Sequence, residues 1–296
     1  MNLRFIETFV WVARLRSFTA AADKLRTTQA AISARIATLE DDFGVRLFER
    51  DNRTVTLTHA GEELLKYAEQ LLGISAQMLE AVSDRATYAG FIAVGVIEAV
   101  VHTWLAELLA QLRQQFPRVR VEIHSYMTAD LHQELLDGNI DLALTAEPLV
   151  NPAIENSAIG DFPLAWVTVR RSAGQAEVPD AALLKASPIL TFLRNSLVYR
   201  DVVTKLGPYC VGRINPISSI AAMVSLVRAG YGVATLPRAV VATELASGEL
   251  IALDAVPELA PLPVVACRRK QSESPLVGSV VQLAVAAARA HGVRQI

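Results

Sequence analysis

Gln29 and Ser33 stand one helical turn apart and carry the polar side chains of this sequence best suited to touch nucleic-acid bases. A glutamine can form a paired hydrogen bond with adenine, and a serine hydroxyl can donate to or accept from several bases. On a helix of about 100° per residue, Ala30, Ala34 and Ala37 share their arc. Their methyl groups allow the backbone to approach closely and can contact thymine. This stretch therefore predicts a helix that lies in the major groove of DNA.

The opposite side of this predicted helix is apolar. Its large side chains recur at steps of four, three and four: Ile32, Ile36, Leu39 and Phe43. Such a stripe faces other helices. Thr28 can cap the first turn through its side-chain oxygen, and Gly44 suits the residue that ends a helix. Because the stripe does the packing, the arc of small residues is available for contact with another molecule.

Two further helices and a hairpin must position this helix. Apolar residues at helical spacing predict a first helix, and Ser17 can cap a short second one. Residues 45–58 read as two short strands around the turn-forming pair Asp51-Asn52. Helix, short helix, tight turn, helix and hairpin give the order of a winged helix-turn-helix, predicted here over residues 1–58.

Four more side chains of this region could hold the DNA backbone or enter the adjacent minor groove. Arg35 lies toward the flank of the recognition helix, and Arg50, Arg53 and Thr54 lie in the hairpin. The first 58 residues carry nine basic and seven acidic side chains, while the whole chain has a net charge of −2. Attraction to DNA must therefore be local. The alternative is a three-helix module that uses the same face for protein contacts.

A single long helix is predicted over residues 59–89. Acidic residues in its first turn suit the positive end of the helix dipole. Apolar side chains form a seam at alternating steps of three and four: Leu64, Leu65, Ala68, Leu71, Leu72, Met78, Leu79 and Val82. A seam of this width can pair with its copy in a second subunit. The alternative is that it packs on its own domain.

From residue 90 onward, strand-like and helix-like segments alternate. The apolar strand "FIAVGVI", a helix near 102–116, the strand "RVRVEIH", a helix near 129–137 and the strand "IDLALTA" form a doubly wound α/β unit. A second such unit begins near Leu164. We expect one lobe over about 90–161 plus 270–296 and another over about 162–269. Two such lobes leave a cleft at the carboxyl ends of their strands.

The N-terminal part of the sequence closely resembles the LysR-type transcriptional regulators. The segments "SFTAAADKL", "TQAAIS", "LEDDFGVRLFER" and "LTHAG" follow one another in the order typical of that family. The later regions are similar to its linker helix and to its effector domain of periplasmic-binding-protein type. The resemblance thus covers essentially the whole chain. It implies a ligand-responsive transcription factor that forms a dimer or tetramer, and that contacts RNA polymerase if it is an activator.

The resemblance also implies which residues contact DNA. The matching positions are Thr28, Gln29, Ser33, Arg50 and Arg53. Two positions depart from the family pattern, because Ala30 replaces a common proline and Ala34 replaces a frequent arginine or lysine, with Arg35 beside it. We expect the overall docking to survive, whereas the preferred base sequence cannot be transferred from relatives.

In the family, effectors lie between the two lobes, near strand ends and helix N-termini. The matching candidates here are Glu98, His102, Thr103, Thr128, Thr145, Asn195, Ser196, Ser218 and Ser219. Many relatives carry a serine or threonine where this chain has Glu98. A carboxylate there would repel a simple anion, which favours an effector with an amino or other donor group, such as an amino acid. The alternative is that Glu98 is a solvated loop residue.

Other function classes find no positive support in the sequence. An apolar content of 52% with 20% charged residues is typical of a globular protein. No run approaches the roughly 18 apolar residues of a membrane span, and the interrupted N-terminus argues against a signal peptide. The histidines show no metal-ligand spacing, and no cofactor or hydrolase motif occurs, so no metal, cofactor or enzymatic activity is predicted.

Two other hypotheses stay open. One is a small-molecule sensor or enzyme whose N-terminal helices serve only for oligomerisation. The other is a redox sensor, which would need Cys210 and Cys267 to approach within disulfide range. Two cysteines are too few for a disulfide framework, and this suggests a reducing cytoplasm, in keeping with a bacterial DNA-binding protein.

Overall fold

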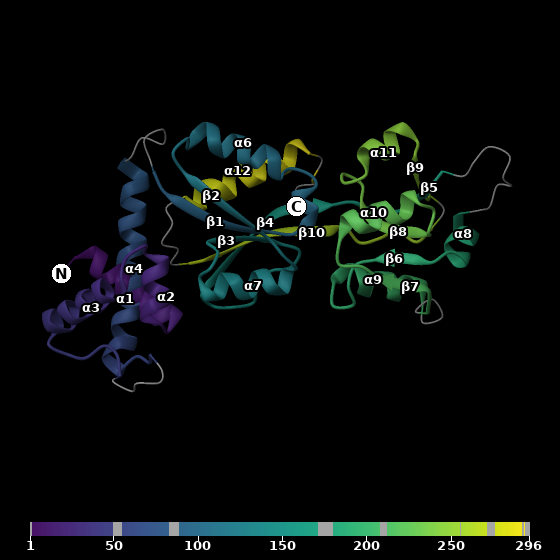
Figure 1. The fold of residues 1–296 in the computed structure, drawn as a ribbon. Helices are drawn as coiled ribbons and strands as arrows, with labels where there is room; N and C mark the ends of the chain where they lie inside the picture. The colour runs from purple at the N-terminus through teal and green to yellow at the C-terminus, as the bar shows by residue number, and fades with distance from the viewer. Residues whose placement is uncertain are drawn as a thin grey trace.

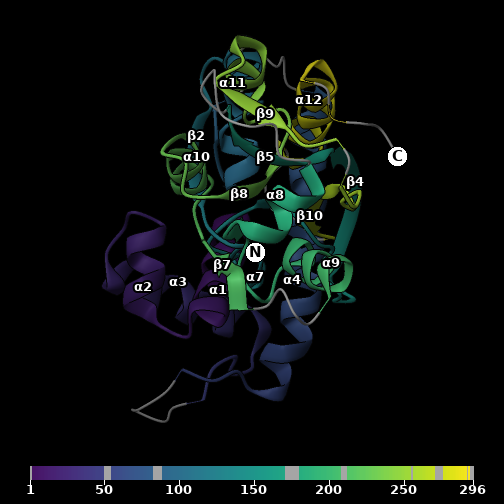
Figure 2. The ribbon, with the colours of Figure 1, turned by 90° about the vertical axis from the view of Figure 1, so that its right-hand side faces the viewer.

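The computed structural model describes residues 2–49, 55–82, 89–170, 180–207, 212–254, 256–270, 276–291 and 293. Figure 1 shows three bodies in a row: an N-terminal helical region with the long helix α4, then two α/β lobes. Figure 2, turned by 90°, shows the N-terminal helices offset to one side of the lobes. None of the described helices is long and apolar enough to cross a membrane.

The N-terminal region consists of three helices with side-chain caps. They are α1 (Leu3–Leu15), α2 (Phe18–Lys24) and α3 (Gln29–Phe43). Ser17 accepts the Ala20 N–H and Thr28 accepts the Ala31 N–H, so each cap satisfies a donor that the helix itself leaves free. Gly44, with a φ of 67°, ends α3 in the left-handed conformation. These caps and the end of α3 fall where the sequence predicts them.

The structure describes only the base of the wing. Instead of two strands, the described residues hold one antiparallel bridge between Phe48 and Leu57. The Glu49 N–H donates to the Thr56 carbonyl at 2.9 Å, next to this bridge. The turn predicted at Asp51-Asn52 lies outside the described residues.

Helix α4 (His59–Val82) packs against α1. Ala68 of α4 is buried in the same apolar cluster as Phe9 and Ile32. A charged pair fixes the contact, because Arg14 donates to Glu69 at 3.0 Å. One side of the predicted seam is therefore used within the chain itself.

The first lobe is a five-stranded sheet in the order β2-β1-β3-β10-β4. Its elements are β1 (Phe91–Val96), α5 (Glu98–Val101), α6 (Leu105–Gln115), β2 (Arg120–Ser125), α7 (Thr128–Asp137), β3 (Leu142–Thr145), β4 (Ile154–Phe162), β10 (Leu262–Arg269) and α12 (Val277–Ala290). Helices α6 and α12 lie on one face and α7 on the other (Figure 1). β1, β2 and β3 are parallel, and β10 runs antiparallel to β3 and β4.

The second lobe is a five-stranded sheet in the order β7-β6-β8-β5-β9. Its elements are β5 (Leu164–Val169), α8 (Asp180–Ala186), β6 (Ile189–Thr191), α9 (Leu197–Leu206), β7 (Ile214–Pro216), α10 (Ile220–Arg228), β8 (Val233–Pro237), α11 (Ala242–Ser247) and β9 (Leu250–Ala252). Helix α10 lies on one face of this sheet and α9 on the other (Figure 1).

Three features of the lobes differ from the expectation. The helix expected near 102–116 is preceded by a separate short helix, α5, which begins at Glu98. Strand β4 is not evident from the sequence, because polar and small residues interrupt its apolar pattern. The chain returns to the first lobe with β10 at Leu262, earlier than the boundary expected at 269, because β10 pairs with β3 and β4 of that lobe.

The winged helix also touches the first lobe. Gly138 ends α7 with a φ of 79°, and a Cβ built there would lie 3.7 Å from side-chain atoms of both Trp11 and Arg14. Lys24 stacks over Trp11 at 4.7 Å and contributes, with Arg14, to the positive field at Asp141. Burial raises the pKa of Asp141 despite these cations. The two regions thus lie side by side at Gly138, and cationic side chains of the winged helix add to the positive field around the half-buried Asp141.

Candidate functional sites

Helix α3 presents two faces, as its sequence predicts. Ile32, Ile36 and Leu39 are buried against the other N-terminal helices. The outward residues are exposed: Thr28, Gln29, Ala30, Ser33, Ala34 and Ala37. The fourth residue of the predicted stripe, Phe43 at the end of the helix, is instead 43% exposed, so the stripe is buried only as far as Leu39. Because Ile32, Ile36 and Leu39 point inward, the exposed face around Gln29 and Ser33 is formed mainly by small side chains. Such a face can enter a DNA groove.

Arg35 is turned partly away from that face. It is half-buried, and its guanidinium donates to the Thr8 hydroxyl at 3.2 Å. It also lowers the pKa of Glu7, although burial of that carboxyl dominates and the net shift is upward. Arg35 therefore ties α3 to α1 with one of its five N–H donors.

The wing residues Arg50, Arg53 and Thr54 lie outside the described residues, so their role stays a prediction. The structure instead reveals how the base of the wing is held. Glu40 is buried at the end of α3 and accepts the N–H groups of Leu47 and Phe48 at 2.8 and 3.3 Å. Sequence reasoning missed this residue, although an acidic side chain directly after buried Leu39 could have pointed to it.

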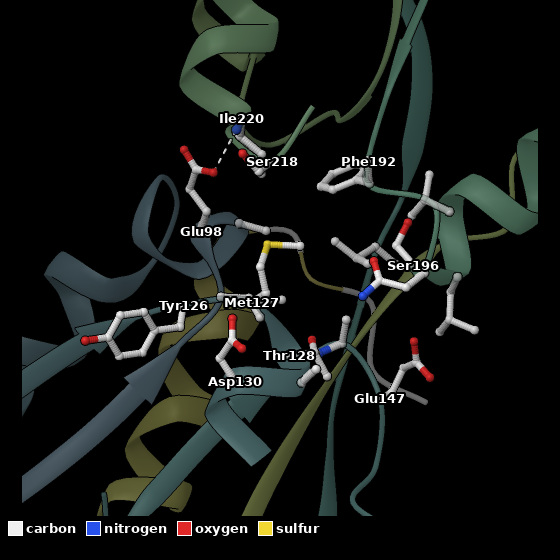
Figure 3. A pocket seen from close by; sticks show the side chains of 18 of the residues that line it. Glu98, Tyr126, Met127, Thr128, Asp130, Glu147, Phe192, Ser196, Ser218 and Ile220 are labelled. Atoms are coloured by element: carbon white, nitrogen blue, oxygen red, sulfur yellow. Dashed lines mark hydrogen bonds between the residues drawn. The ribbon is translucent and has the colours of Figure 1, made fainter. Parts of the chain in front are cut away.

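A cavity of about 1060 Å³ lies between the two lobes. It is formed where β1 and β3 end and where α5, α7, α9 and α10 begin, as Figure 3 shows for the side chains around it. Strand ends and helix starts meet there because the strands of a parallel sheet all end at the same edge. This volume is at the upper end of the usual range for a small-molecule site.

Seven of the nine residues predicted for the cleft line this cavity: Glu98, His102, Thr128, Asn195, Ser196, Ser218 and Ser219. Two do not. The Thr103 hydroxyl turns back to the Ala99 carbonyl at 2.7 Å, within its own helical turn. Thr145 is fully buried, and its hydroxyl donates to the Glu147 carbonyl at 2.8 Å. Each of these hydroxyls gives its one hydrogen-bond donor to a nearby backbone carbonyl and so has no donor left for a ligand.

Several other lining residues were not predicted. They are mainly apolar or acidic and include Tyr126, Met127, Asp130, His132, Glu147 and Phe192. Each lies within a few residues of a predicted strand end or helix start. Their position next to these ends is the signal in the sequence that could have identified them.

Among the residues that line the cavity, Glu98 makes hydrogen bonds to the opposite lobe. It belongs to the first lobe, yet its carboxylate accepts the Ile220 N–H at 2.7 Å and the Ala221 N–H at 3.2 Å from α10 of the second lobe. The Ser219 hydroxyl donates to it at 3.0 Å, and a ring nitrogen of His102 lies at 3.2 Å. The alternative of a solvated loop residue is therefore wrong, because Glu98 bridges the lobes.

The charges around the cavity are unbalanced. The described lining residues include the carboxyl groups of Glu98, Asp130 and Glu147 but no lysine or arginine. Arg200 approaches Glu147 from outside the lining at 3.6 Å. Burial lowers the pKa of His132, so this ring is neutral at pH 7. The cavity therefore favours a cation over an anion.

The redox hypothesis gains nothing from the described residues. Cys267 is fully buried, and its sulfur lies 3.4 Å from the Thr145 hydroxyl. Burial raises the pKa of the Cys267 thiol, so little reactive thiolate exists at neutral pH. Cys210 lies outside the described residues.

Both the N-terminal helical region and the two-lobed domain match known protein families. Residues 3–62 match the bacterial regulatory helix-turn-helix proteins of the lysR family, and residues 85–289 match the LysR substrate binding domain. The HTH-type transcriptional regulator YofA of Bacillus subtilis (strain 168) is 31% identical over 239 residues, which cover 80% of this chain and 81% of YofA.

Solved structures of full length have the same fold. A variant of full-length OxyR from Pseudomonas aeruginosa is 21% identical with a TM-score of 0.66, over 98% of this chain and 95% of that one. Full-length LysG from Corynebacterium glutamicum with bound effector arginine is 22% identical with a TM-score of 0.63, over all of both chains. The predicted fold class, a winged helix-turn-helix, a linker helix and a two-lobed α/β domain, is confirmed.

Proposed function

This chain belongs to the LysR family of transcriptional regulators, and from that membership we propose how its two sites divide the work. It is a DNA-binding regulator with a helix-turn-helix and an effector-binding domain. We propose that the exposed face of α3 reads DNA and that a small metabolite, such as an amino acid, binds in the interlobe cavity. The observation that supports this division most is the smooth outer face of α3, which is exposed while Ile32 and Ile36 pack inward.

For DNA, we propose Gln29 and Ser33 as base contacts, with Thr28, Ala30, Ala34 and Ala37 lying along the groove. Arg50, Arg53 and Thr54 of the wing are proposed to hold phosphates or enter the minor groove. Thr28 can contribute backbone contacts while its side chain caps α3. The target implies the bacterial cytoplasm, and an activating role would add RNA polymerase as a partner.

The test of DNA binding is its dependence on salt. A regulator that neutralises phosphates loses affinity steeply as salt rises, because bound counterions are released. We expect specific binding to DNA upstream of its own or a neighbouring gene, with such a slope. A protein that binds no DNA under these conditions would instead support a sensor or enzyme that uses its helices only for oligomerisation.

For the effector, the support is the cavity itself and the similarity in fold to LysG, whose structure was solved with arginine bound as its effector. A thermal-shift screen of metabolites tests the assignment. A true effector stabilises the folded protein by about 2.7 kcal/mol at a hundred times its Kd. Substitution of Phe192 by Ala in the cavity wall should weaken that shift, and a shift unchanged in this variant would place the ligand elsewhere.

We propose that α4 carries a subunit contact, but through a strip that differs from the predicted seam, because most described seam residues pack within the chain and only Met78 among them is exposed. Leu64, Leu65 and Leu71 are half-buried against the winged helix, whereas Tyr67, Ile74 and Met78 stay 67%, 55% and 64% exposed. Leu79 and Val82 carry side chains outside the described set. An apolar strip left uncovered on a long helix is the usual mark of a partner helix.

The subunit contact can be tested with a charge on that strip. Met78→Glu should dissociate the oligomer without disturbing the fold, because the native side chain is largely exposed. Lys66→Glu, on another side of α4, serves as the matched control. An oligomer that survives Met78→Glu in sedimentation velocity would refute this role of α4.

A further inference from the structure

Helix α10 begins at the cleft with backbone donors that its own turns cannot satisfy. The first N–H groups of any helix lack an internal acceptor and carry the positive end of the dipole. An anion is the usual partner at such a position. In this chain the anion is already present: Glu98 of the opposite lobe accepts from Ile220 and Ala221.

The contact is built from both sides. Ser219 caps α10 by accepting the Ala222 N–H at 3.3 Å, while its hydroxyl donates to Glu98 at 3.0 Å. His102, one turn after Glu98 in the first lobe, lies 3.2 Å from the same carboxylate. Figure 3 shows the Glu98 side chain directed across the cleft at the start of α10. The bond therefore joins the lobes on the rim of the cavity.

We propose that Glu98 acts as a built-in anion that holds the lobes together and sets the charge of the effector. The position where a carboxylate ligand would bind α10 is filled by the chain itself. The cavity then accepts a small molecule with an ammonium group and a largely apolar body. This inference rests on the proposed effector role of the cavity and narrows its ligand class from amino acids in general to amines that need no carboxylate site at α10.

The other helix starts around the cavity support the same selection. Ser196 caps α9 by accepting the Tyr199 N–H at 3.1 Å, and Asp130 places a carboxylate in the first turn of α7. The starts of α9 and α10 thus each have a capping side-chain oxygen, whereas α7 has no side-chain cap and carries only the acidic Asp130 in its first turn. Asp130 remains in the lining as an acceptor for an ammonium group, beside Glu147, which Arg200 approaches at 3.6 Å from outside the lining. No lysine or arginine lines the described cavity to hold an anion.

The protonation state of Glu98 agrees with this role. Burial raises the pKa of the Glu98 carboxyl. Hydrogen bonds from Ile220, Ala221, His102 and Ser219 together lower that pKa by more than burial raises it, so the net shift is downward. The group is therefore an anion at neutral pH. The surrounding walls are largely apolar, with Met127, Phe192 and Leu197 among the lining residues, which suits the body of an amphiphilic amine.

Amide hydrogen exchange tests the bond directly. In Glu98→Ala, the amides of Ile220 and Ala221 should exchange about tenfold faster or more, because a charged acceptor is lost. The Ala222 amide, bonded to Ser219, is the internal control and should change little. Equal protection of Ile220 and Ala221 in wild type and variant would overturn the bond. Glu98→Gln, which keeps the shape, should give intermediate exchange and guards against a folding defect in the alanine variant.

Rescue by a free anion tests whether the position selects a carboxylate. Sodium acetate should raise the melting temperature of Glu98→Ala more than that of wild type, with sodium chloride at equal ionic strength as control. The truncated side chain leaves room for the added carboxylate at α10. An equal response of both proteins to acetate would count against an anion position at this helix start.

The ligand class is tested with matched probes in the thermal-shift assay. Phenethylamine should stabilise wild type more than phenylacetate does, and Glu98→Ala should shift the preference toward phenylacetate. Stronger stabilisation of wild type by phenylacetate would overturn the charge selection. If the wider metabolite screen finds no compound of either charge that binds either protein, the effector role of the cavity fails, while amide exchange still decides the Glu98 bond.

Discussion

Helices α3 and α10 both begin with backbone N–H groups that have no acceptor within the helix, and these groups find their acceptors in different parts of the chain. Thr28 caps α3 from the adjacent position in the chain, and the rest of its first turn faces outward with Gln29 exposed. Helix α10 is capped by its neighbour Ser219 and also by Glu98, which lies 122 positions from Ile220 in the sequence. One helix start is completed locally and the other only by a second lobe.

This difference has a consequence for regulation. The surface of α3 is complete once the N-terminal helices have folded, because its packing partners lie within that region. The chemistry of the cleft depends on how the two lobes are placed. A ligand that binds one arrangement of the lobes better than another shifts the populations of the two arrangements. The cleft is therefore suited to respond to a ligand, whereas α3 is suited to bind DNA with a fixed surface.

The largest effect is expected when a buried side chain that packs α3 against the other N-terminal helices is truncated. Ile32→Ala should lower the free energy of unfolding of the N-terminal region by about 2–5 kcal/mol, because Ile32 is 0% exposed and its loss leaves a cavity. Ser33→Ala, one position along on the exposed face, should change it by less than about 0.5 kcal/mol. Denaturant unfolding measures both. Comparable losses would mean that the two faces of α3 are not distinct.

A smaller effect should appear in DNA recognition. Gln29→Ala should reduce discrimination between the operator and unrelated DNA by about 1–3 kcal/mol, if its amide pairs with a base. Binding titrations on both DNAs measure this. A loss of equal size on every sequence would show that Gln29 contacts the backbone instead.

The wing should contribute to DNA affinity equally for all base sequences. Arg53→Ala should weaken binding to all DNA sequences and lower the slope of log K against log salt by about one unit, because one phosphate contact is lost. Affinities measured over a series of salt concentrations give this slope. A slope that stays at the wild-type value would argue against a phosphate contact for Arg53.

The smallest effect is expected for the capping residues at the starts of α3 and α10. Thr28→Ala should cost about 1 kcal/mol of stability, and its effect should add to that of Glu98→Ala within about 0.5 kcal/mol. Ser219→Ala and Glu98→Ala should instead be coupled by more than that, since their oxygens are hydrogen-bonded at 3.0 Å. Double-mutant cycles on thermal unfolding measure both couplings. Additivity of Ser219 with Glu98 would mean that the two lobes cap α10 independently.

The prediction of α3 from sequence succeeded because its signals are local. The stripe of Ile32 and Ile36, the cap at Thr28 and the stop at Gly44 all lie within one short segment. Arg35 shows the limit of this approach. A helical projection places it on the flank, but the hydroxyl that binds it belongs to Thr8 on another helix.

The cleft was harder to predict for the same reason. Seven polar candidates line the cavity, because strand ends and helix starts can be placed from sequence patterns. Thr103 and Thr145 fail, because each hydroxyl finds an acceptor in its own backbone. The order of the strands was also hidden: β10 joins the first sheet through pairing with β3 and β4.

The amino-acid sequence by itself determined the reading helix, the long α4 and the two α/β lobes, because periodicity, caps and turn residues act over a few positions. Only the tertiary structure decided what Glu98 does. A carboxylate near a strand end can repel an anion, face solvent or replace the anion itself, and the choice depends on which donors it meets. The N–H groups of Ile220 and Ala221 reach it only when the two lobes pack together.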